Sequence, residues 1–347
     1  MKKKIAVILF NLGGPDNLNS VKPFLFNLFN DKAIIQAPKI IRYFLAKLIA
    51  KKREKTAKKI YSYIGGKSPI YDLTILQANE LEKILTHEKE NYKVFISMRY
   101  WLPLVSNTIV KVKKWNPNKI ILLPLYPQFS STTSASSINS WHKESKKVFY
   151  NIDTKIICCY PKNEKFIKAH VNKISDKLKE IKKIDKKLEN SILLFSAHGL
   201  PERIIKKGDP YKYQVELTVK TIMKNLNEKI EHAVCYQSKI GPLKWIEPST
   251  KDIIIKNAKL NKNIILIPIA FVSEHSETLV ELDIEYKKLA KENGCDNYYR
   301  ISALGTNKEF ILALSSLIKA QTKNKFLNKR ICPPSCSKCL YNKEKIL

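Results

Sequence analysis

Residues 190–198 read NSILLFSAH, an apolar run that ends in small residues and a histidine. A glycine and, soon after, a proline follow His198, which indicates that the chain enters a loop there. Continuous apolar runs that are separated by segments of helical period are typical of parallel sheets covered by helices on both faces. The stretch therefore predicts a buried strand of an α/β fold, with His198 at its carboxyl end.

Seven other runs have the same apolar, β-rich character, and longer segments of helical period lie between them. They span residues 5–12, 93–100, 119–127, 154–161, 231–238, 263–273 and 297–304. Four runs in each half predict two doubly wound domains, each with a four-stranded parallel sheet. We expect these domains at residues 1–165 and 166–305, a helix at 306–325 that packs back on the first domain, and a cysteine-containing tail at 326–347.

Composition limits the classes of protein to which the chain can belong. It has 347 residues with a hydrophobic fraction of 44%, which is ordinary for a folded protein and excludes wholesale disorder. No apolar stretch approaches the roughly 18 residues that a membrane-spanning helix needs. The basic N-terminus runs into Gly-Gly-Pro at residues 13–15 without a secretory cleavage site. We therefore expect a cytoplasmic protein, either free or peripheral on the inner membrane.

The net charge of +32 comes from 63 Lys and Arg residues against 31 Asp and Glu residues. These basic residues are scattered along the whole chain, and no nucleic-acid-binding motif accompanies them, so we expect no nucleic-acid partner. A positive potential is enough to favour contact with an anionic membrane surface. The sequence does not distinguish a monomer from a homodimer.

Polar groups follow several of the predicted strands at the point where each strand ends. His198, Arg99 and Tyr100 lie at such ends, as do residues 126–137 and 271–277. Ligands of open parallel sheets bind beyond the carboxyl ends of the strands, so we expect these groups to line one cleft. No glycine-rich dinucleotide or P-loop motif is present, and nothing indicates a nucleotide ligand.

The segment 273–294 predicts a helix that begins at Ser273 and carries an acidic line. Three glutamates at i, i+4 and i+8 would share one face of this helix, and Glu274 and His275 lie at its start. A solvated acidic face is one interpretation, and a route for a cation is the other. Carboxylates beside an imidazole suit ferrous iron. The three glutamates are Glu277, Glu281 and Glu285.

Seven strings occur in a fixed order along almost the whole chain: NLGGPDNLNSVKPFLFNLF (11–29), IGGKSPI (64–70), RYWLPL (99–104), LPLYPQFSSTTSASS (123–137), SAHGLPERIIKKGDPYKYQ (196–214), CYQSKIGPLKWIEPST (235–250) and FVSEHSETLVELDIEY (271–286). Together they resemble the ferrochelatases of bacterial type. The resemblance implies a chelatase-like fold of two Rossmann-like domains with a cleft between them. It also implies a lyase that inserts Fe2+ into protoporphyrin IX to form protohaem, the terminal step of haem biosynthesis. A cobalt or nickel chelatase on the same fold and a tetrapyrrole carrier without turnover are the alternatives.

The resemblance also implies roles for individual residues. His198 matches the proton acceptor or iron ligand, and Glu277 matches the carboxylate that faces it. His275 and Glu274 are neighbours of this pair, while Glu281 and Glu285 match the acidic line that carries metal or protons. Porphyrin metallation removes two pyrrole protons, so a base with a pKa near neutrality is required. The implied substrate-binding residues are Tyr61, Arg99 and Tyr100 near the macrocycle, Trp245 and Phe271 as apolar walls, and Arg53 and Ser68 near the propionates.

Residues 34–55 mix bulky apolar side chains with Lys and Arg. A helix from Pro38 onward would place Ile41, Phe44, Leu45 and Leu48 on one side. This pattern fits a core helix with a basic solvated face, and it equally fits a helix at a membrane surface. The resemblance places the segment at the mouth of the porphyrin cleft and therefore favours a peripheral membrane contact.

Seven cysteines are present, and three of them lie close together in the sequence CPPSCSKCL near the C-terminus. Cys332, Cys336 and Cys339 suit a [2Fe–2S] cluster or zinc if a fourth ligand comes from elsewhere. Some ferrochelatases hold such a cluster with C-terminal cysteines and one upstream cysteine. This sequence departs from the animal pattern, because the C-terminal spacing differs and Ser131 stands at the place of the upstream cysteine. Cys158 or Cys159, which lie at a predicted strand end, could supply that ligand instead. Uncommitted surface thiols are the other interpretation.

Overall fold

The computed structural model describes residues 2–147, 152–184, 188–239, 241–323 and 330–341. The chain forms two compact units, of which the first comprises Met1–Cys159 with Leu314–Lys329 and the second comprises Tyr160–Ala313 with Arg330–Leu347. Among the helices of these described ranges, none is long and apolar enough to cross a membrane.

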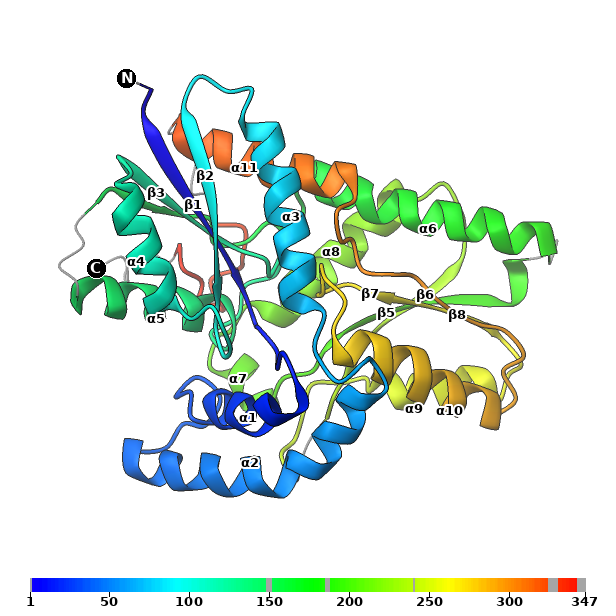
Figure 1. Cartoon of the computed structure of the whole chain (residues 1–347). Coiled ribbons are helices and arrows are strands. Elements are labelled where there is room, and N and C mark those ends of the chain that lie inside the picture. The colour runs from blue at the N-terminus through cyan, green and yellow to red at the C-terminus, as the bar shows by residue number, and fades with distance from the viewer. Residues whose placement is uncertain (1, 148–151, 185–187, 240, 324–329, 342–347) are drawn as a thin grey trace. The chain divides into compact units, whose positions relative to one another are not determined.

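The first unit contains a parallel sheet in the order β2-β1-β3-β4. Its strands are β1 (Lys4–Asn11), β2 (Asn91–Met98), β3 (Lys119–Pro124) and β4 (Thr154–Ile156). Its helices are α1 (Val21–Phe29), α2 (Lys39–Ser62), α3 (Ile70–Leu85), α4 (Val105–Trp115) and α5 (Ser134–Lys147), and the short 3₁₀ turn Leu18–Ser20 precedes α1. The central strand β1 is buried from Ile5 onward because helices cover both faces of the sheet, as its unbroken apolar sequence predicts (Figure 1).

The second unit repeats this plan with the order β6-β5-β7-β8. Its strands are β5 (Ser191–His198), β6 (Glu231–Gln237), β7 (Asn263–Pro268) and β8 (Tyr298–Arg300). Figure 1 shows α6 (Glu164–Ile184) and α8 (Tyr211–Asn225) on one side of this sheet, and α9 (Thr250–Ala258) and α10 (Tyr286–Glu292) on the other. This unit also contains α7 (Glu202–Lys206) and a 3₁₀ turn at Leu188–Asn190. Helix α11 (Lys308–Thr322) begins in the second unit, and from Leu314 onward it belongs to the first.

Two four-stranded parallel sheets confirm the predicted fold class, while three details differ from the prediction. Strands β4 and β8 are only three residues long, and β7 ends at Pro268, which leaves 269–273 as a loop. The predicted α-helix from Ser273 is wrong in type and start. A π-helix runs over Glu277–Glu285, with Ser276 at its N-cap, and only then does α10 begin.

Candidate active site

His198 and Glu277 meet in the second unit. His198 is the last residue of β5, a strand held between β6 and β7, and Glu277 is the first residue of the π-helix. The distance from His198 Nδ1 to Glu277 Oε2 is 2.8 Å, and both side chains are about one-third exposed (35% and 29%). An ionised carboxylate can only accept a hydrogen bond, so Nδ1 carries the proton and Nε2 is left with its lone pair in the neutral ring.

The charges of this pair depend on each other. Burial disfavours the imidazolium, but the charge and hydrogen bond of Glu277 outweigh this effect and raise the pKa of His198. Burial also opposes the charge of Glu277, and there the neighbouring His198 prevails and lowers the pKa of the carboxyl. The imidazole therefore takes up a proton more readily than a free histidine does.

Glu281 lies next to this pair and shares Ser238 with it. The Ser238 backbone N–H donates to Glu281 Oε1 (2.9 Å), and its hydroxyl lies 2.6 Å from Glu281 Oε2 and 3.3 Å from Glu277 Oε2. The Tyr286 hydroxyl also donates to Glu281 Oε1, at 2.8 Å. Burial and the charge of Glu277 raise the pKa of Glu281, so this carboxyl can hold a proton that Glu277 cannot.

The π-helix changes the predicted acidic line. Its hydrogen bonds join residues five apart, as between the Tyr286 N–H and the Glu281 carbonyl, so side chains four apart no longer stack. Glu277 and Glu281 still converge on Ser238, whereas Glu285 is exposed. Within the described ranges no group of three or more His, Cys, Asp or Glu side chains is arranged to hold a metal ion. The metal-binding roles of His198, Glu277, Glu281 and Glu285 therefore stay predictions.

Among the described residues, the hydrogen bonds of Glu274 and His275 go to partners other than His198. The Glu274 carboxylate accepts hydrogen bonds from Arg300 and from the Ala303 N–H (2.8 Å). His275 is buried, with its Nδ1 accepting from the Thr278 N–H (3.3 Å) and its Nε2 without a partner among the described residues. Because burial lowers the pKa of His275, the ring is neutral near pH 7.

Two aromatic rings lie beside histidines of the second unit. The Trp245 ring centroid lies 6.4 Å from that of His198, and the Phe271 ring centroid lies 4.4 Å from that of His275. Gly199 makes the first approach possible, because a Cβ there would meet the Trp245 ring at 3.1 Å and the Gln237 carbonyl oxygen at 2.8 Å. The structure thus brings both predicted walls next to predicted catalytic histidines.

In the first unit, Arg99 and Tyr100 converge on a carboxylate that our sequence reasoning missed. Asp31 is 8% exposed and accepts hydrogen bonds from Arg99 Nη2 (2.8 Å), from the Tyr100 hydroxyl (2.8 Å) and from Ser136 Oγ. The Arg99 Nε also donates to Ser136 Oγ, at 2.7 Å. This network holds the Arg99 guanidinium in one orientation at the end of β2.

The other predicted substrate-binding residues of this unit lie in α2 and before α3. Tyr61 is buried in an apolar cluster with Tyr100, and Arg53 lies over the Phe29 ring at 5.7 Å. Ser68 is buried, and a Cβ at Gly14 would lie only 2.4 Å from it. The Ser68 hydroxyl therefore packs closely against backbone.

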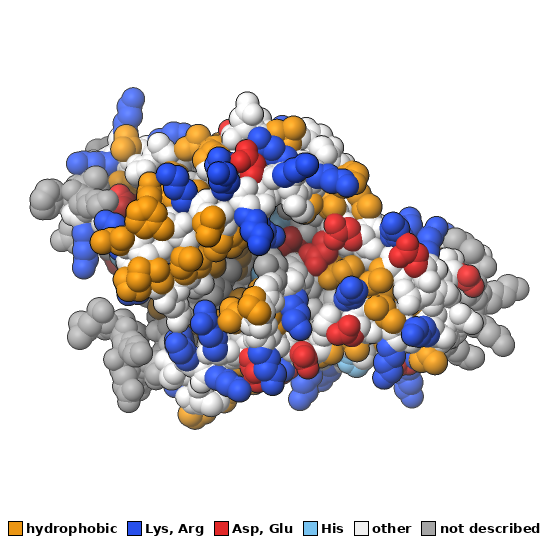
Figure 2. Space-filling model, turned by 90° about the horizontal axis from the view of Figure 1, so that it is seen from below, with side chains coloured by type: hydrophobic (Ala, Val, Ile, Leu, Met, Phe, Trp, Pro, Cys, Tyr) orange, Lys and Arg blue, Asp and Glu red, His pale blue; other side chains and the backbone are white. Residues whose placement is uncertain are grey.

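The start of α2 is exposed rather than part of a core. Ile41, Phe44 and Leu48 are 53%, 64% and 64% exposed, and Leu45 is 38% exposed. Figure 2 looks from below onto this side of the first unit and shows hydrophobic side chains gathered beside Lys and Arg. The core-helix interpretation is therefore wrong for this segment.

The C-terminal cysteines are buried together, so the interpretation as surface thiols is wrong. Cys332, Cys336 and Cys339 form an apolar cluster, and the Arg330 guanidinium donates hydrogen bonds to the carbonyls of residues 332, 333, 334 and 336. A hydrogen bond from Cys332 lowers the pKa of Cys339 to about 6. Cys158 is also buried but belongs to the first unit.

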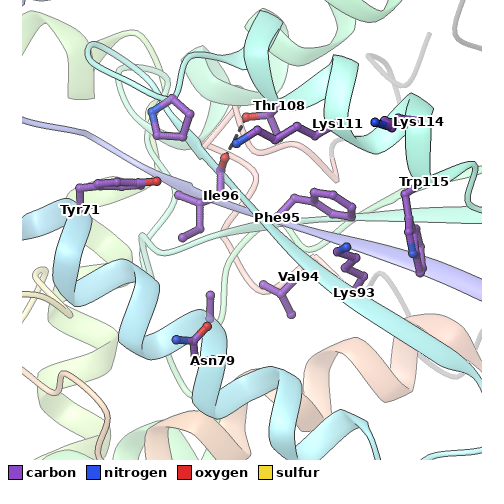
Figure 3. A pocket seen from close by; sticks show the side chains of 12 residues that line it. Tyr71, Asn79, Lys93, Val94, Phe95, Ile96, Thr108, Lys111, Lys114 and Trp115 are labelled. Carbon is purple, nitrogen blue, oxygen red and sulfur yellow. Dashed lines mark hydrogen bonds between the residues drawn. The ribbon is translucent and has the colours of Figure 1, made fainter.

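A groove of about 560 Å³ lies along the edge strand β2, between α3 and α4 (Figure 3). Tyr71, Phe95 and Trp115 contribute aromatic rings, and the Thr108 hydroxyl donates to the Ile96 carbonyl at 2.8 Å. None of the predicted site residues lines this groove. It is therefore separate from the chemistry of His198 and Glu277.

Sequence reasoning missed Asp31, Ser238 and Arg300 as parts of these networks. Ser238 lies inside one of the quoted strings. Its φ of +63° is in the left-handed region, which is uncommon for a residue other than glycine and cannot be read from the sequence. Asp31 and Arg300 lie outside the seven quoted strings, and no motif in the neighbouring sequence indicates a role for them.

Comparison with known proteins gives one consistent result. The family model described as Ferrochelatase matches residues 4–322. A ferrochelatase of Pelagibacter ubique is 55% identical over 347 residues, which cover 98% of this chain and 98% of that protein. One of Rickettsia bellii is 51% identical, covering 98% of this chain and 95% of that protein. The solved structure of SirB from Bacillus subtilis with Fe3+ matches in fold alone, with a TM-score of 0.55, 12% identity, and coverage of 93% of this chain and 97% of that one.

Proposed function

Because the chain belongs to the ferrochelatase family and inserts Fe2+ into protoporphyrin IX to form protohaem, we propose that His198 and Glu277 carry out its proton transfer. The observation that carries this proposal is the 2.8 Å contact between His198 Nδ1 and Glu277 Oε2. The reaction exchanges two pyrrole protons for one Fe2+ ion, so each turnover needs a base and a path along which protons leave.

His198 Nε2 is the atom that accepts a pyrrole proton. Glu277 holds the proton of Nδ1 and stabilises the imidazolium that forms, as an orienting carboxylate does for a general base. Ser238 links this pair to Glu281, whose raised pKa makes it the next acceptor. Glu277, whose pKa is lowered, passes the Nδ1 proton on without keeping it, and Glu281 receives that proton through the Ser238 hydroxyl. Fe2+ meanwhile takes the place of the two protons on the ring nitrogens.

The aromatic and the polar residues that the resemblance implies together hold the substrate in this proposal. Trp245 and Phe271 are flat apolar surfaces beside the histidines, and such surfaces suit a planar macrocycle. Asp31 and Ser136 orient the Arg99 guanidinium, which is 22% exposed and is our proposed contact to the porphyrin. Tyr100 is 1% exposed and donates its hydroxyl hydrogen bond to Asp31, so its proposed part is to hold this network beside the ring. Arg53 and Ser68 are proposed partners of the propionates, with Tyr61 near the ring.

The test is anaerobic incubation with protoporphyrin IX and Fe2+, followed by the loss of porphyrin fluorescence. We expect His198→Ala to abolish turnover while porphyrin binding survives. We expect Glu277→Gln to lower kcat by about 10²–10⁴-fold, the usual contribution of general acid–base catalysis. The exposed residues His87 and Glu292 provide the matched controls His87→Ala and Glu292→Gln, which should turn over like wild type. Near-normal kcat in His198→Ala would remove the proposed mechanism.

We further propose that the exposed start of α2 makes a peripheral contact with anionic membrane. Four bulky apolar side chains there lie beside exposed lysines, a combination that binds the interface of an anionic bilayer. Phe44→Glu and Leu48→Glu should reduce sedimentation with anionic liposomes at low salt. Val110→Glu is the control, because Val110 in α4 is equally exposed at 64%. Equal sedimentation of all three variants would contradict the proposal.

The [2Fe–2S] cluster stays a prediction. The burial of three thiols in one cluster supports it, whereas the described residues hold no group of three or more ligands arranged for a metal. Purified protein with visible absorbance that is lost in Cys336→Ala would support a cluster, and colourless protein with full activity would contradict it.

A further inference from the structure

Arg300 makes an ion-pair network that holds both flanks of Glu277. The Arg300 side chain is 9% exposed and lies at the end of β8. Its Nη1 donates to both Glu274 carboxylate oxygens, at 2.9 and 3.1 Å, and its Nη2 lies 2.7 Å from Asp283 Oδ2. Glu274 precedes the π-helix by three residues, and Asp283 lies inside it. One guanidinium thus connects the sheet to both sides of the catalytic carboxylate.

Further contacts make the anchor rigid. The Ala303 N–H donates to Glu274 Oε1 at 2.8 Å, and Lys173 Nζ donates to the carbonyls of Ser302 (3.3 Å) and Ala303 (3.1 Å). The Tyr298 hydroxyl, also from β8, donates to the Leu282 carbonyl at 2.6 Å. Residues of β8 therefore bind the π-helix near its middle and also bind the segment just before its start.

The π-helical hydrogen bond to the fifth residue is much rarer than the α-helical hydrogen bond to the fourth, so contacts from outside the segment help to hold this pattern. A return to the α-helical pattern would rotate Glu277 and Glu281 relative to each other, and both could no longer reach Ser238. We propose that Arg300 is a positioning residue that keeps the π-helix in register and thereby holds Glu277 against His198. This inference rests on the proposed role of the His198–Glu277 pair.

The test is a double-mutant cycle between Arg300→Met and Glu277→Gln, read by porphyrin metallation. Loss of a residue that orients a catalytic group typically costs about 10–100-fold in activity, and we expect this loss in kcat with little change in KM for porphyrin. Arg300→Lys, which keeps the charge but not the fork, should recover part of the loss. Arg203→Met is the control, because Arg203 in α7 is exposed.

The cycle separates positioning from a general structural effect. If Arg300 acts through Glu277, Arg300→Met costs nothing more once Glu277 is Gln. If the two losses multiply, or if Arg300→Met turns over like wild type, the inference is overturned. A normal kcat in Glu277→Gln alone would instead refute the proposed role of the pair.

A second variant keeps the inference testable if Arg300→Met does not fold. Asp283→Asn removes the ion pair between Arg300 and the π-helix and keeps the ion pair between Arg300 and Glu274. We expect a smaller loss of kcat that also disappears in the Glu277→Gln background. An Asp283→Asn loss that persists in that background would overturn the inference.

Discussion

Gly199→Ala is the substitution whose effect on the site can be worked out most directly from the structure. The new Cβ would lie 2.8 Å from the Gln237 carbonyl oxygen and 3.1 Å from the Trp245 ring. The first distance involves backbone of the neighbouring strand, which also accepts the Gly199 N–H at 2.8 Å, so strand β6 cannot simply move aside. Overpacking of this kind costs about 1–3 kcal/mol of unfolding free energy.

In a domain of this size each kcal/mol lowers Tm by about 2–4 °C, so we expect a fall of roughly 2–12 °C by thermal unfolding. Displacement of Trp245 from its position 6.4 Å from His198 should also lower kcat/KM for porphyrin. Misplacement by about 1 Å can cost on the order of 100-fold. Gly241→Ala is the control, because a Cβ there meets no described atom within 4 Å beyond its chain neighbours, although the φ of +70° adds local strain. A Gly199→Ala protein with wild-type Tm and kcat/KM would refute this reasoning.

Three other predictions follow from the charges. Asp31→Asn should lower the unfolding free energy by about 1–3 kcal/mol in urea, because Arg99 loses a buried ionic partner, and the exposed Asp72→Asn should change it far less. Burial opposes the charge of Glu277, but His198 lowers the pKa of this carboxyl from 4.5 to about 2. The ionised Glu277 therefore contributes to the unfolding free energy above pH 4.5, and this contribution is lost as the pH falls towards 2. The stability difference between wild type and Glu277→Gln should therefore shrink over that interval, and a constant difference would contradict the assignment. Arg330→Ala should release the carbonyls of the C-terminal segment and speed alkylation of Cys336, which an unchanged alkylation rate would disprove.

The strands could be predicted from local sequence, whereas the pairing of His198 with Glu277 was expected only from the resemblance to a known family. Residues 5–10 form an unbroken apolar run, and such a run predicts a strand that helices bury on both faces. His198 and Glu277 were predicted to face each other from motifs, and they do touch. Glu274 was grouped with them by sequence proximity, yet its carboxylate is held by Arg300, 26 residues away.

The sequence by itself determined the two sheets, the place of His198 at a strand end and the family, because burial patterns and motif strings are written in consecutive residues. Only the tertiary structure decided that Glu277–Glu285 is a π-helix, that Glu285 is exposed, and that the C-terminal thiols are buried. It also decided that Asp31 accepts a hydrogen bond from Ser136, which lies 105 residues away in the sequence. The physical reason is that hydrogen bonds and ion pairs select partners by distance in space, and folding alone brings such distant residues within reach of each other.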